Sequence, residues 1–273
     1  MNKLLVPSLI IISALFSACE QFDYNVYQTN RYDGPVEATT SYNLELLRAL
    51  PQKDTLYLVF TGDTQRYYDD LDNMIDVINA FPKVDAVFVA GDLVEFAMTH
   101  EFEWVCEELT KLNAPFLTVI GNHDCLANGV ETYTDLYGPV NYAFTWNGIR
   151  FIMHNTNGRE FNFNGTVPDI QWMKEQLADT ANYEGTIFLS HVPSNHEDFD
   201  AALESPYSTL IRESKKTILS VNGHRHRFGL NQTYGDKIWY LNTSSPHNRY
   251  VAYVKVYPYS QDAHTFDCEL VHY

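Results

Sequence analysis

The sequence predicts an α/β fold in which two mixed β-sheets face each other and helices flank them, as a sandwich. Apolar strands and amphipathic helices alternate in the first half of the chain, which is typical of parallel β-α-β units. A hairpin signal follows in the middle, and alternating strands close the chain. We expect a single domain over residues 51–273, because a chain of 273 residues can bury a full core and shows no internal repeat.

Three unbroken apolar runs open this domain, at residues 55–60, 86–90 and 115–120. Such runs are expected of strands that are buried on both faces. Between them, apolar side chains recur at helical spacing, which predicts one helix over residues 71–78 and another over 102–112. Strand, helix, strand, helix, strand is the order that a parallel sheet requires.

The second half of the chain mixes hairpin, helix and strand signals. Asn147-Gly148 is a strong hairpin turn between two predicted strands, and Pro168 is expected to open a helix that runs through Leu177. Two more buried strands and three alternating, antiparallel strands are predicted at residues 186–189, 217–221, 237–241, 250–256 and 265–271.

The first residues are typical of a secretory signal. A short basic head precedes the apolar stretch from Leu4 to Phe16, and Ser17-Ala18-Cys19 follows it. The small residues before Cys19 resemble a bacterial lipobox, although Phe16 stands where that motif prefers leucine. We expect a signal peptide over residues 1–18 and a lipid-anchored tether with an opening segment over 19–50. The alternative is an ordinary signal peptide cut near Ala18.

Lipidation of Cys19 would anchor the protein to a membrane leaflet. The protein is therefore expected to be exported to the cell envelope, at the periplasmic or the outer-membrane face. Its net charge of −17, from 18 Lys and Arg against 35 Asp and Glu, argues against nucleic-acid binding, because phosphate backbones are held by basic surfaces.

The three other cysteines are Cys106, Cys125 and Cys268, and none forms a Cys-x-x-Cys pair. Thiolate zinc sites and redox motifs of that kind are therefore absent. Cys106 falls on the apolar face of the helix predicted over 102–112 and is expected to be a small buried hydrophobe.

Five polar blocks follow the predicted strands, and each begins where a strand ends. Sites in α/β folds collect at the carboxyl ends of strands, so these blocks are expected to meet. Their carboxylate, amide and imidazole groups together would form a binding site for two divalent metal ions. The blocks are Gly62-Asp63-Thr64-Gln65, Gly91-Asp92-Leu93-Val94-Glu95, Gly121-Asn122-His123-Asp124, Ser190-His191-Val192 and Gly223-His224-Arg225-His226.

In this order the blocks resemble the calcineurin-like metallophosphoesterase superfamily, over roughly residues 55 to 245. The resemblance implies two divalent metal ions, which would be manganese, iron, zinc or magnesium. Asp92 matches the carboxylate that bridges the ions and holds them about 3.5–4 Å apart. The other implied ligands are Asp63 and His226 at the first metal position and Asn122, His191 and His224 at the second.

Gln65 departs from the family pattern, which usually has Asp-x-His in the first block. An amide oxygen is a harder and weaker ligand than imidazole. If Gln65 is a ligand, the first metal position is expected to prefer manganese or magnesium. If it is not, a water molecule takes that place.

His123 is not a metal ligand in the family pattern but faces the substrate. The resemblance implies that it is a general acid for the leaving alkoxide or a donor to the phosphoryl oxygens. Glu95 matches the carboxylate that orients this histidine and raises its pKa. Asp124 is the rival partner, although its place in a turn favours a loop or cap residue.

The implied activity is hydrolysis of phosphoester bonds, monoester or diester, in a small phosphorylated substrate, with metal-bound hydroxide attacking phosphorus in line. The alternative is a catalytically weak binding protein that keeps the fold. Gly-x-Ser-x-Gly and His-Glu-x-x-His are absent, which excludes a serine hydrolase and a zincin on sequence grounds. Glu95-Phe96-Ala97 lacks the arginine of the phosphoprotein phosphatases, which disfavours that class.

Overall fold

The structure is a computed structural model, and it describes residues 39–260 and 264–273. The predicted signal peptide, Cys19 and most of the predicted tether lie outside the described residues. Within them, no helix combines the length and the apolar character needed to cross a bilayer.

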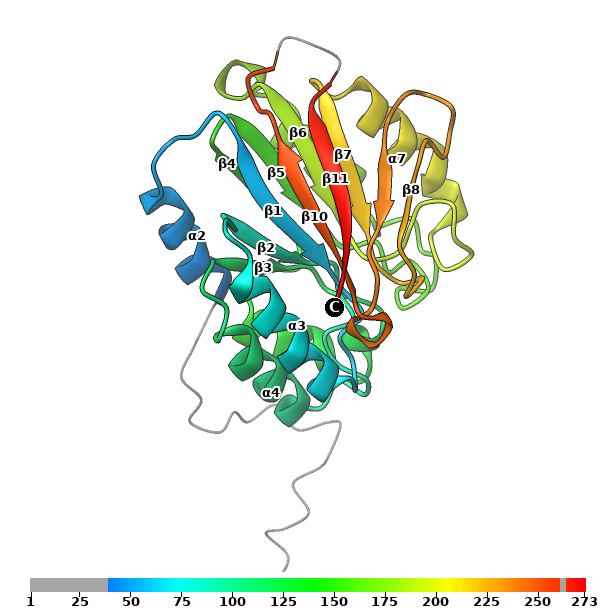
Figure 1. Ribbon diagram of the computed structural model, residues 1–273. Coiled ribbons are helices and arrows are strands. Elements are labelled where there is room, and N and C mark those ends of the chain that lie inside the picture. Colours follow the sequence, from blue (N-terminus) through cyan, green and yellow to red (C-terminus); the bar gives the residue numbers. More distant parts are fainter. Residues whose placement is uncertain (1–38, 261–263) are drawn as a thin grey trace, which may run out of the picture.

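Two mixed β-sheets face each other, as the sequence predicted (Figure 1). Along the first sheet the strands follow in the order β11 (Phe266–His272), β10 (Tyr250–Val256), β1 (Leu56–Thr61), β2 (Ala86–Val89) and β3 (Phe116–Thr118). Along the second sheet they follow in the order β4 (Tyr142–Trp146), β5 (Ile149–Met153), β6 (Gly185–Leu189), β7 (Thr217–Asn222), β9 (Tyr240–Asn242) and β8 (Gly229–Asn231).

The core between the sheets is built from the inward faces of the apolar strands. Rings from both sheets stack there: Phe88 of β2 lies 5.3 Å from Phe151 of β5, between centroids, and Phe60 lies 5.2 Å from Phe88. Offset aromatic pairs of this kind add to the stabilisation from burial alone. This shared core fixes the two sheets relative to each other, and with them the loops at their edges.

Helices cover the outer faces of the sheets (Figure 1). The apolar sides of three helices pack on the first sheet, and those of two helices pack on the second. The former are α3 (Tyr68–Ala80), α4 (Thr99–Leu109) and α5 (Gly129–Leu136), and the latter are α6 (Ile170–Leu177) and α7 (Ala201–Glu213). Short 3₁₀ turns lie at His123–Cys125, Thr180–Asn182 and Pro246–Asn248.

The predicted strands and helices are confirmed with small shifts at their ends. The hairpin turn is also confirmed, since Asn147 and Gly148 have φ values of 49° and 78°, which is the left-handed conformation that such a turn requires. The helix after Pro168 begins at Ile170, because the Asp169 side chain caps it by accepting a hydrogen bond from the main-chain N–H of Trp172 (2.9 Å). Cys106 is buried on α4, as expected.

The closing strands differ from the prediction in one respect. β10 and β11 pair antiparallel, as expected, but β9 pairs parallel with β7 and antiparallel with β8. The expectation of purely antiparallel pairing for residues 237–241 was therefore wrong. The chain leaves β7, reverses direction to form β8 at the edge of the sheet, and reverses again to form β9 between the two. β9 therefore runs in the same direction as β7.

Within residues 39–260 and 264–273, three helices have no counterpart in the sequence prediction: α2 (Thr39–Ala49), α5 and α7. α2 belongs to the predicted opening segment and packs against the start of β3. There the Asn43 side-chain oxygen accepts a hydrogen bond from the main-chain N–H of Phe116 (3.0 Å), and Leu47 is buried in the core. Residues before the predicted domain start at 51 thus contribute to its core.

Candidate metal centre

The five polar blocks meet at one edge of the molecule, where strands of both sheets end. β1, β2 and β3 run parallel in one sheet, and β6 and β7 run parallel in the other. Their carboxyl ends therefore deliver the blocks to the same place. Main-chain hydrogen bonds join neighbouring blocks: Asp63 N–H donates to Gly91 C=O (2.9 Å), and Gly223 N–H donates to His191 C=O (3.0 Å).

The loops that carry these blocks approach each other too closely for ordinary side chains. A Cβ atom at Gly121 would lie 2.0 Å from the main-chain nitrogen of Asp92. Five ligand candidates adopt positive φ: Asp63 at 54°, Gln65 at 35°, Asp92 at 52°, His224 at 72° and His226 at 52°. Backbone strain of this kind is concentrated at functional sites, where the surrounding structure holds it in place.

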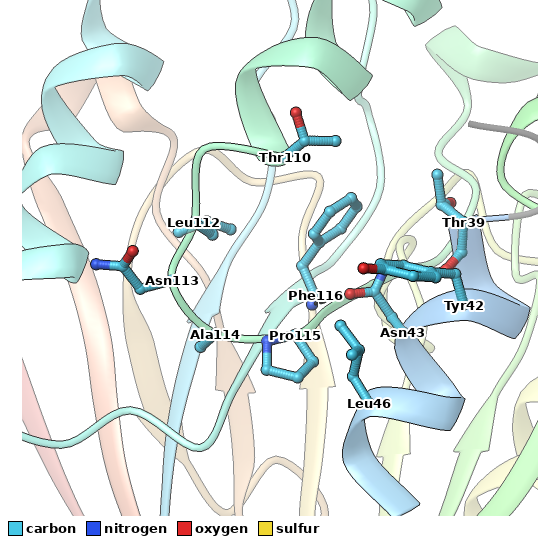
Figure 2. A pocket seen from close by; sticks show the side chains of 10 residues that line it. All are labelled: Thr39, Tyr42, Asn43, Leu46, Thr110, Leu112, Asn113, Ala114, Pro115 and Phe116. Carbon is cyan, nitrogen blue, oxygen red and sulfur yellow. Dashed lines mark hydrogen bonds between the residues drawn. The ribbon is translucent and has the colours of Figure 1, made fainter. Parts of the chain in front are cut away.

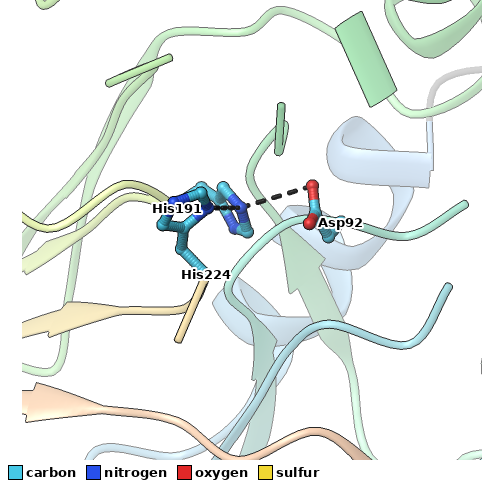
Figure 3. Close-up of side chains that lie close together, drawn as sticks. All are labelled: Asp92, His191 and His224. Atoms are coloured by element: carbon cyan, nitrogen blue, oxygen red, sulfur yellow. Dashed lines mark hydrogen bonds and ion pairs between the residues drawn. The ribbon is translucent and has the colours of Figure 1, made fainter. Parts of the chain in front are cut away.

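His191 is held so that one ring nitrogen faces the centre of the site. Its Nδ1–H donates to the carbonyl of Ala90 (2.7 Å), so in the neutral ring the lone pair is on Nε2. That nitrogen lies 3.0 Å from Asn122 Oδ1, 3.3 Å from Asp92 Oδ1 and 3.3 Å from His224 Nδ1. Figure 3 shows the Asp92, His191 and His224 side chains turned toward one another.

His224 Nδ1 also lies 2.9 Å from Asn122 Oδ1, so potential ligand atoms of four side chains converge here. We call this set, Asp92, Asn122, His191 and His224, the second metal position. Electron-rich atoms at these separations repel one another unless protons or a metal cation lie among them. Two imidazoles, an amide and a carboxylate also form a donor set that suits a divalent transition metal.

Asp63, Asp92 and His226 form the neighbouring set, the first metal position, and they offer ligand atoms within 4.8 Å of one another. His226 Nε2 lies 3.6 Å from Asp63 Oδ1. The second carboxylate oxygen of Asp63 is buried and accepts no hydrogen bond. A buried carboxylate oxygen without a donor is costly, so the residues at this position fit a cation as well.

Proton affinities in the metal-free site follow from burial and close charges. Burial raises the pKa of Asp63 to about 7. Burial is the largest influence on Asp92 and acts to raise its pKa, but the charges of His191 and His123 and their hydrogen bonds together outweigh it, and the pKa falls to about 2. Burial acts to lower the pKa of His191, yet Asp92 raises it to about 9. The metal-free site thus holds protons that a cation would have to displace.

Gln65 is buried beside the first metal position, but its amide nitrogen is what faces the ligands. Its Nε2–H donates to Asp92 Oδ2 (3.0 Å). A nitrogen that donates in this way supplies no lone pair to a metal. In this structure Gln65 therefore supports the Asp92 carboxylate, and its role as a metal ligand stays a prediction.

His123 lies at the edge of the site, and its orientation differs from the expectation in one detail. Its main-chain N–H donates to Asp92 Oδ1 (2.9 Å), and its Nδ1–H donates to the main-chain carbonyl of Glu95 (2.9 Å). The Glu95 carboxylate was expected to hold this ring; it pairs instead with Arg66, at 3.3 Å. The turn after Asp92 brings the carbonyl of residue 95 to the imidazole and leaves the side chain to reach Arg66.

The direction of the expected pKa shift at His123 is nevertheless found. Burial, the largest influence, acts to lower its pKa, but the charges of Asp92 and Glu95 and the hydrogen bond to the Glu95 carbonyl together raise it. Asp124 is a loop residue, as its place in the turn suggested. Its two carboxylate oxygens accept hydrogen bonds from the main-chain N–H groups of Val94 (3.0 Å) and Gly121 (2.7 Å).

Two groups of residues near the site were missed by the sequence analysis. The segment from His154 to Asn157 follows β5 and supports the ligand loops: Thr156 Oγ1 accepts from the N–H of Val192 (2.8 Å), and Asn157 Nδ2–H donates to the Ile120 carbonyl (3.1 Å). A polar block directly after a buried strand was the available signal. The other group, His196 and Asp198, lies on the loop after His191, where no strand end marks it.

A cavity of about 590 Å³ lies elsewhere, between α2 and the segment from Thr110 to Phe116 (Figure 2). Its lining includes the exposed side chains of Tyr42 and Leu46 and no residue of the five blocks. This cavity is therefore separate from the candidate metal centre.

Comparison with known proteins gives the following matches. The model of the calcineurin-like phosphoesterase family matches residues 56–228. A probable cyclic nucleotide phosphodiesterase of Coxiella burnetii is 24% identical over 151 residues, which cover 53% of this chain and 60% of that protein. The match thus spans less than two thirds of that relative.

Solved structures show the same fold at low identity. A dimetal phosphatase from Danio rerio has a TM-score of 0.54 and 14% identity, with 80% of this chain and 99% of that chain covered. A purple acid phosphatase from yellow lupin, Lupinus luteus, has a TM-score of 0.55 and 13% identity, with 81% and 54% covered. These likenesses concern the arrangement of the two sheets and their helices.

Proposed function

The chain belongs to the calcineurin-like phosphoesterase family, and from that premise we propose that it is a metal-dependent hydrolase of phosphoester bonds. The observation that carries this proposal is the position of Asp92. This carboxylate belongs to both sets of potential ligands, with His191 and His224 on one side and with Asp63 and His226 on the other. A carboxylate shared in this way supports a two-metal centre.

The ligand types favour different ions at the two positions. The first position offers two carboxylates and one imidazole, an oxygen-rich set that favours manganese or magnesium. The second adds two imidazoles and an amide oxygen to Asp92, which favours zinc or iron. We therefore propose a centre that holds two divalent ions, which are able to be different elements at the first and the second metal position.

Bound divalent ions would neutralise the negative charge of the phosphoryl oxygens and supply a reactive water at neutral pH. Hydrogen bonds within the protein fix the side chain that would lie between the two ions. Asp92 is fixed by hydrogen bonds from the His123 main-chain N–H and from Gln65. A protein with a net charge of −17 repels a phosphoester in general, so cations at this edge provide the local attraction that substrate binding needs.

His123 is proposed to donate a proton to the leaving oxygen. Because its Nδ1–H is held by the Glu95 carbonyl, Nε2 is the nitrogen left to face a substrate. The raised pKa of His123 favours the protonated ring. A general acid of this kind contributes about 10²–10⁴-fold to a rate.

The substrate class is proposed to be a small phosphodiester or phosphomonoester. The similarity to a probable cyclic nucleotide phosphodiesterase supports including cyclic nucleotides among the diesters to be tested. The stretch from Asp92 to Ala97 has no arginine of the phosphoprotein-phosphatase type, and this weighs against phosphoproteins.

One screen tests the activity. Purified, manganese-loaded protein is assayed on an aryl phosphomonoester, an aryl phosphodiester, a 3′,5′-cyclic nucleotide and pyrophosphate, with bound metal measured in parallel. The Asp63→Asn variant controls for contaminating phosphatases. We expect turnover of at least one ester, and none with the control. Two bound ions without turnover of any of the four would instead favour the alternative, a binding protein that keeps the fold.

We also propose that Cys19 is lipidated and anchors the enzyme in the cell envelope. The proposal is supported by the basic head, the apolar stretch and the small residues before Cys19. Expression of the full chain in a bacterial host with labelled palmitate should label the wild type and not the Cys19→Ser variant. Equal labelling of the two, or none of either, would contradict it.

A further inference from the structure

We propose that Asp198 is a positioning residue for His224, which presents the metal-binding nitrogen of that imidazole and thereby sets the affinity of the second metal position. This inference rests on the proposed function, because it assumes that the second position holds an ion. Asp198 lies on the loop between β6 and α7 and belongs to none of the five blocks.

The two ring nitrogens of His224 face opposite surroundings. Nδ1 lies 2.9 Å from Asn122 Oδ1, inside the second metal position. Nε2 lies 3.2 Å from Asp198 Oδ2, outside it. A neutral imidazole carries one proton, so a proton held on Nε2 by the carboxylate leaves the lone pair on Nδ1, toward the metal. Outer carboxylates orient metal-binding histidines in this way in many proteins.

Asp198 is itself fixed in place. Its side chain is 7% exposed, and its other carboxylate oxygen forms an ion pair with Arg159. Its main-chain carbonyl accepts a hydrogen bond from the N–H of Arg159 (3.1 Å). The guanidinium also argues that Asp198 is not a metal ligand, since an ion bound there would lie close to a second positive charge.

His196 restricts the same ring from another side. The His196 and His224 ring centroids lie 4.3 Å apart at 84°, so the His196 ring packs edge-on against it. His196 Nδ1 lies 3.2 Å from His224 Nε2, but it already accepts a hydrogen bond from the Asp198 main-chain N–H (3.2 Å). The carboxylate is the stronger acceptor of the two, and we assign the Nε2–H of His224 to Asp198.

The test compares three variants of the full chain. Asp198→Ala removes the acceptor, and Asp198→Asn keeps an acceptor oxygen without the charge. Asp200→Ala is the matched control, because Asp200 is equally buried two residues away but caps α7, where it accepts from the Ala202 N–H (3.0 Å). Metal-free proteins are titrated with zinc by calorimetry, and imidazole ¹⁵N shifts report which nitrogen of His224 is protonated.

We expect Asp198→Ala to weaken one of the two zinc affinities by about 10–100-fold, which is the usual cost of losing such a partner, and to leave the other unchanged. Asp198→Asn should lie between it and the wild type. Asp200→Ala should lower the melting temperature and keep both affinities. In metal-free wild type the His224 proton should reside on Nε2, and Asp198→Ala should disturb this.

Unchanged zinc affinities and unchanged ¹⁵N shifts in Asp198→Ala would overturn the proposal. So would three bound ions in the wild type and two in that variant, since Asp198 would then be a ligand. Both readouts are independent of turnover. A protein that binds two ions and hydrolyses nothing would refute the proposed function and leave the positioning role standing.

Discussion

At the scale of single residues, Asp92 is the point where the two metal positions join. Its Oδ1 lies 3.3 Å from His191 Nε2, and its Oδ2 accepts from Gln65. Asp92→Asn keeps the shape of the side chain and removes a negative charge that both ions share. We expect activity to fall by at least about 100-fold, because even an outer partner of a ligand is worth 10–100-fold.

Metal content of the Asp92→Asn variant, measured by elemental analysis, should fall with its activity. The metal-free variant should be less stable than the metal-free wild type, because the substitution leaves the buried His191 without its charged partner. Two bound ions together with wild-type turnover would show that Asp92 does not bridge.

His123 gives a prediction that depends on the leaving group. His123→Ala should slow an alkyl phosphoester by about 10²-fold or more and an activated aryl ester far less, because a good leaving group needs little protonation. Metal content should stay near normal, since no ligand is removed. Equal losses in kcat/KM on the two esters would argue for simple charge stabilisation by the imidazole instead.

Gln65 tests how complete the first metal position is. Gln65→His places an imidazole where the family usually has one, and it should tighten zinc or iron binding at that position. It also removes the hydrogen bond from Gln65 to Asp92, so any gain has to exceed that loss. Zinc titration of the metal-free variant measures the change. Gln65→Ala, which loses the same hydrogen bond and adds no imidazole, is the control: equal affinities in the His and Ala variants would mean that residue 65 points away from the ion.

At the scale of elements, the segment after β5 carries a buried histidine with a structural role. His154 Nδ1–H donates to the Ile152 carbonyl (3.1 Å), and Nε2 accepts from the Tyr207 hydroxyl of α7 (2.8 Å). Burial lowers the pKa of His154 to about 4, so the ring is neutral when the protein is folded. It links β5 to α7.

This histidine predicts how stability depends on pH. The unfolded chain takes up a proton near pH 6.5 and the folded chain only near 4, so stability is full above about 6.5 and is lost as the pH falls toward 4. The loss amounts to roughly 3 kcal/mol. The difference in unfolding free energy between wild type and His154→Gln should therefore vary with pH in this window. A constant difference would exclude the role of His154.

The elements that the sequence predicted are those with one strong periodicity. The buried strands and the helices α3, α4 and α6 have continuous or regularly spaced apolar residues, and a tight turn defines the hairpin. α7 was missed because it contains Pro206, a residue that usually ends a helix, and α5 because it begins with Gly129 and contains few strong helix formers. Tertiary packing, not local preference, makes these segments helical.

The candidate site likewise contains residues that the sequence could place and residues that it could not. The ligand candidates could be placed because each follows a buried strand, where the backbone alone determines the position. The partner of His123 could not, because a main-chain carbonyl leaves no trace in the identity of residue 95. Asp198 could not either, since it reaches His224 from a loop, where no strand end marks its position in the sequence.

At the scale of the whole molecule, the candidate metal centre lies at the edge where strands of both sheets end. Asp63, Asp92 and Asn122 follow strands of the first sheet, and His191, His224 and His226 follow strands of the second. Each metal position therefore draws ligands from both sheets. Ions bound here would join the sheets as well as act on substrate, so their removal should also cost stability.

The most direct measurement is anomalous X-ray diffraction from crystals of the manganese-loaded protein. We predict two peaks about 3.5–4 Å apart, with the Asp92 carboxylate between them. Asp63 and His226 should bind one ion, and Asn122, His191 and His224 the other. A single peak, or ions bound away from Asp92, would contradict the two-metal centre and with it the proposed hydrolysis.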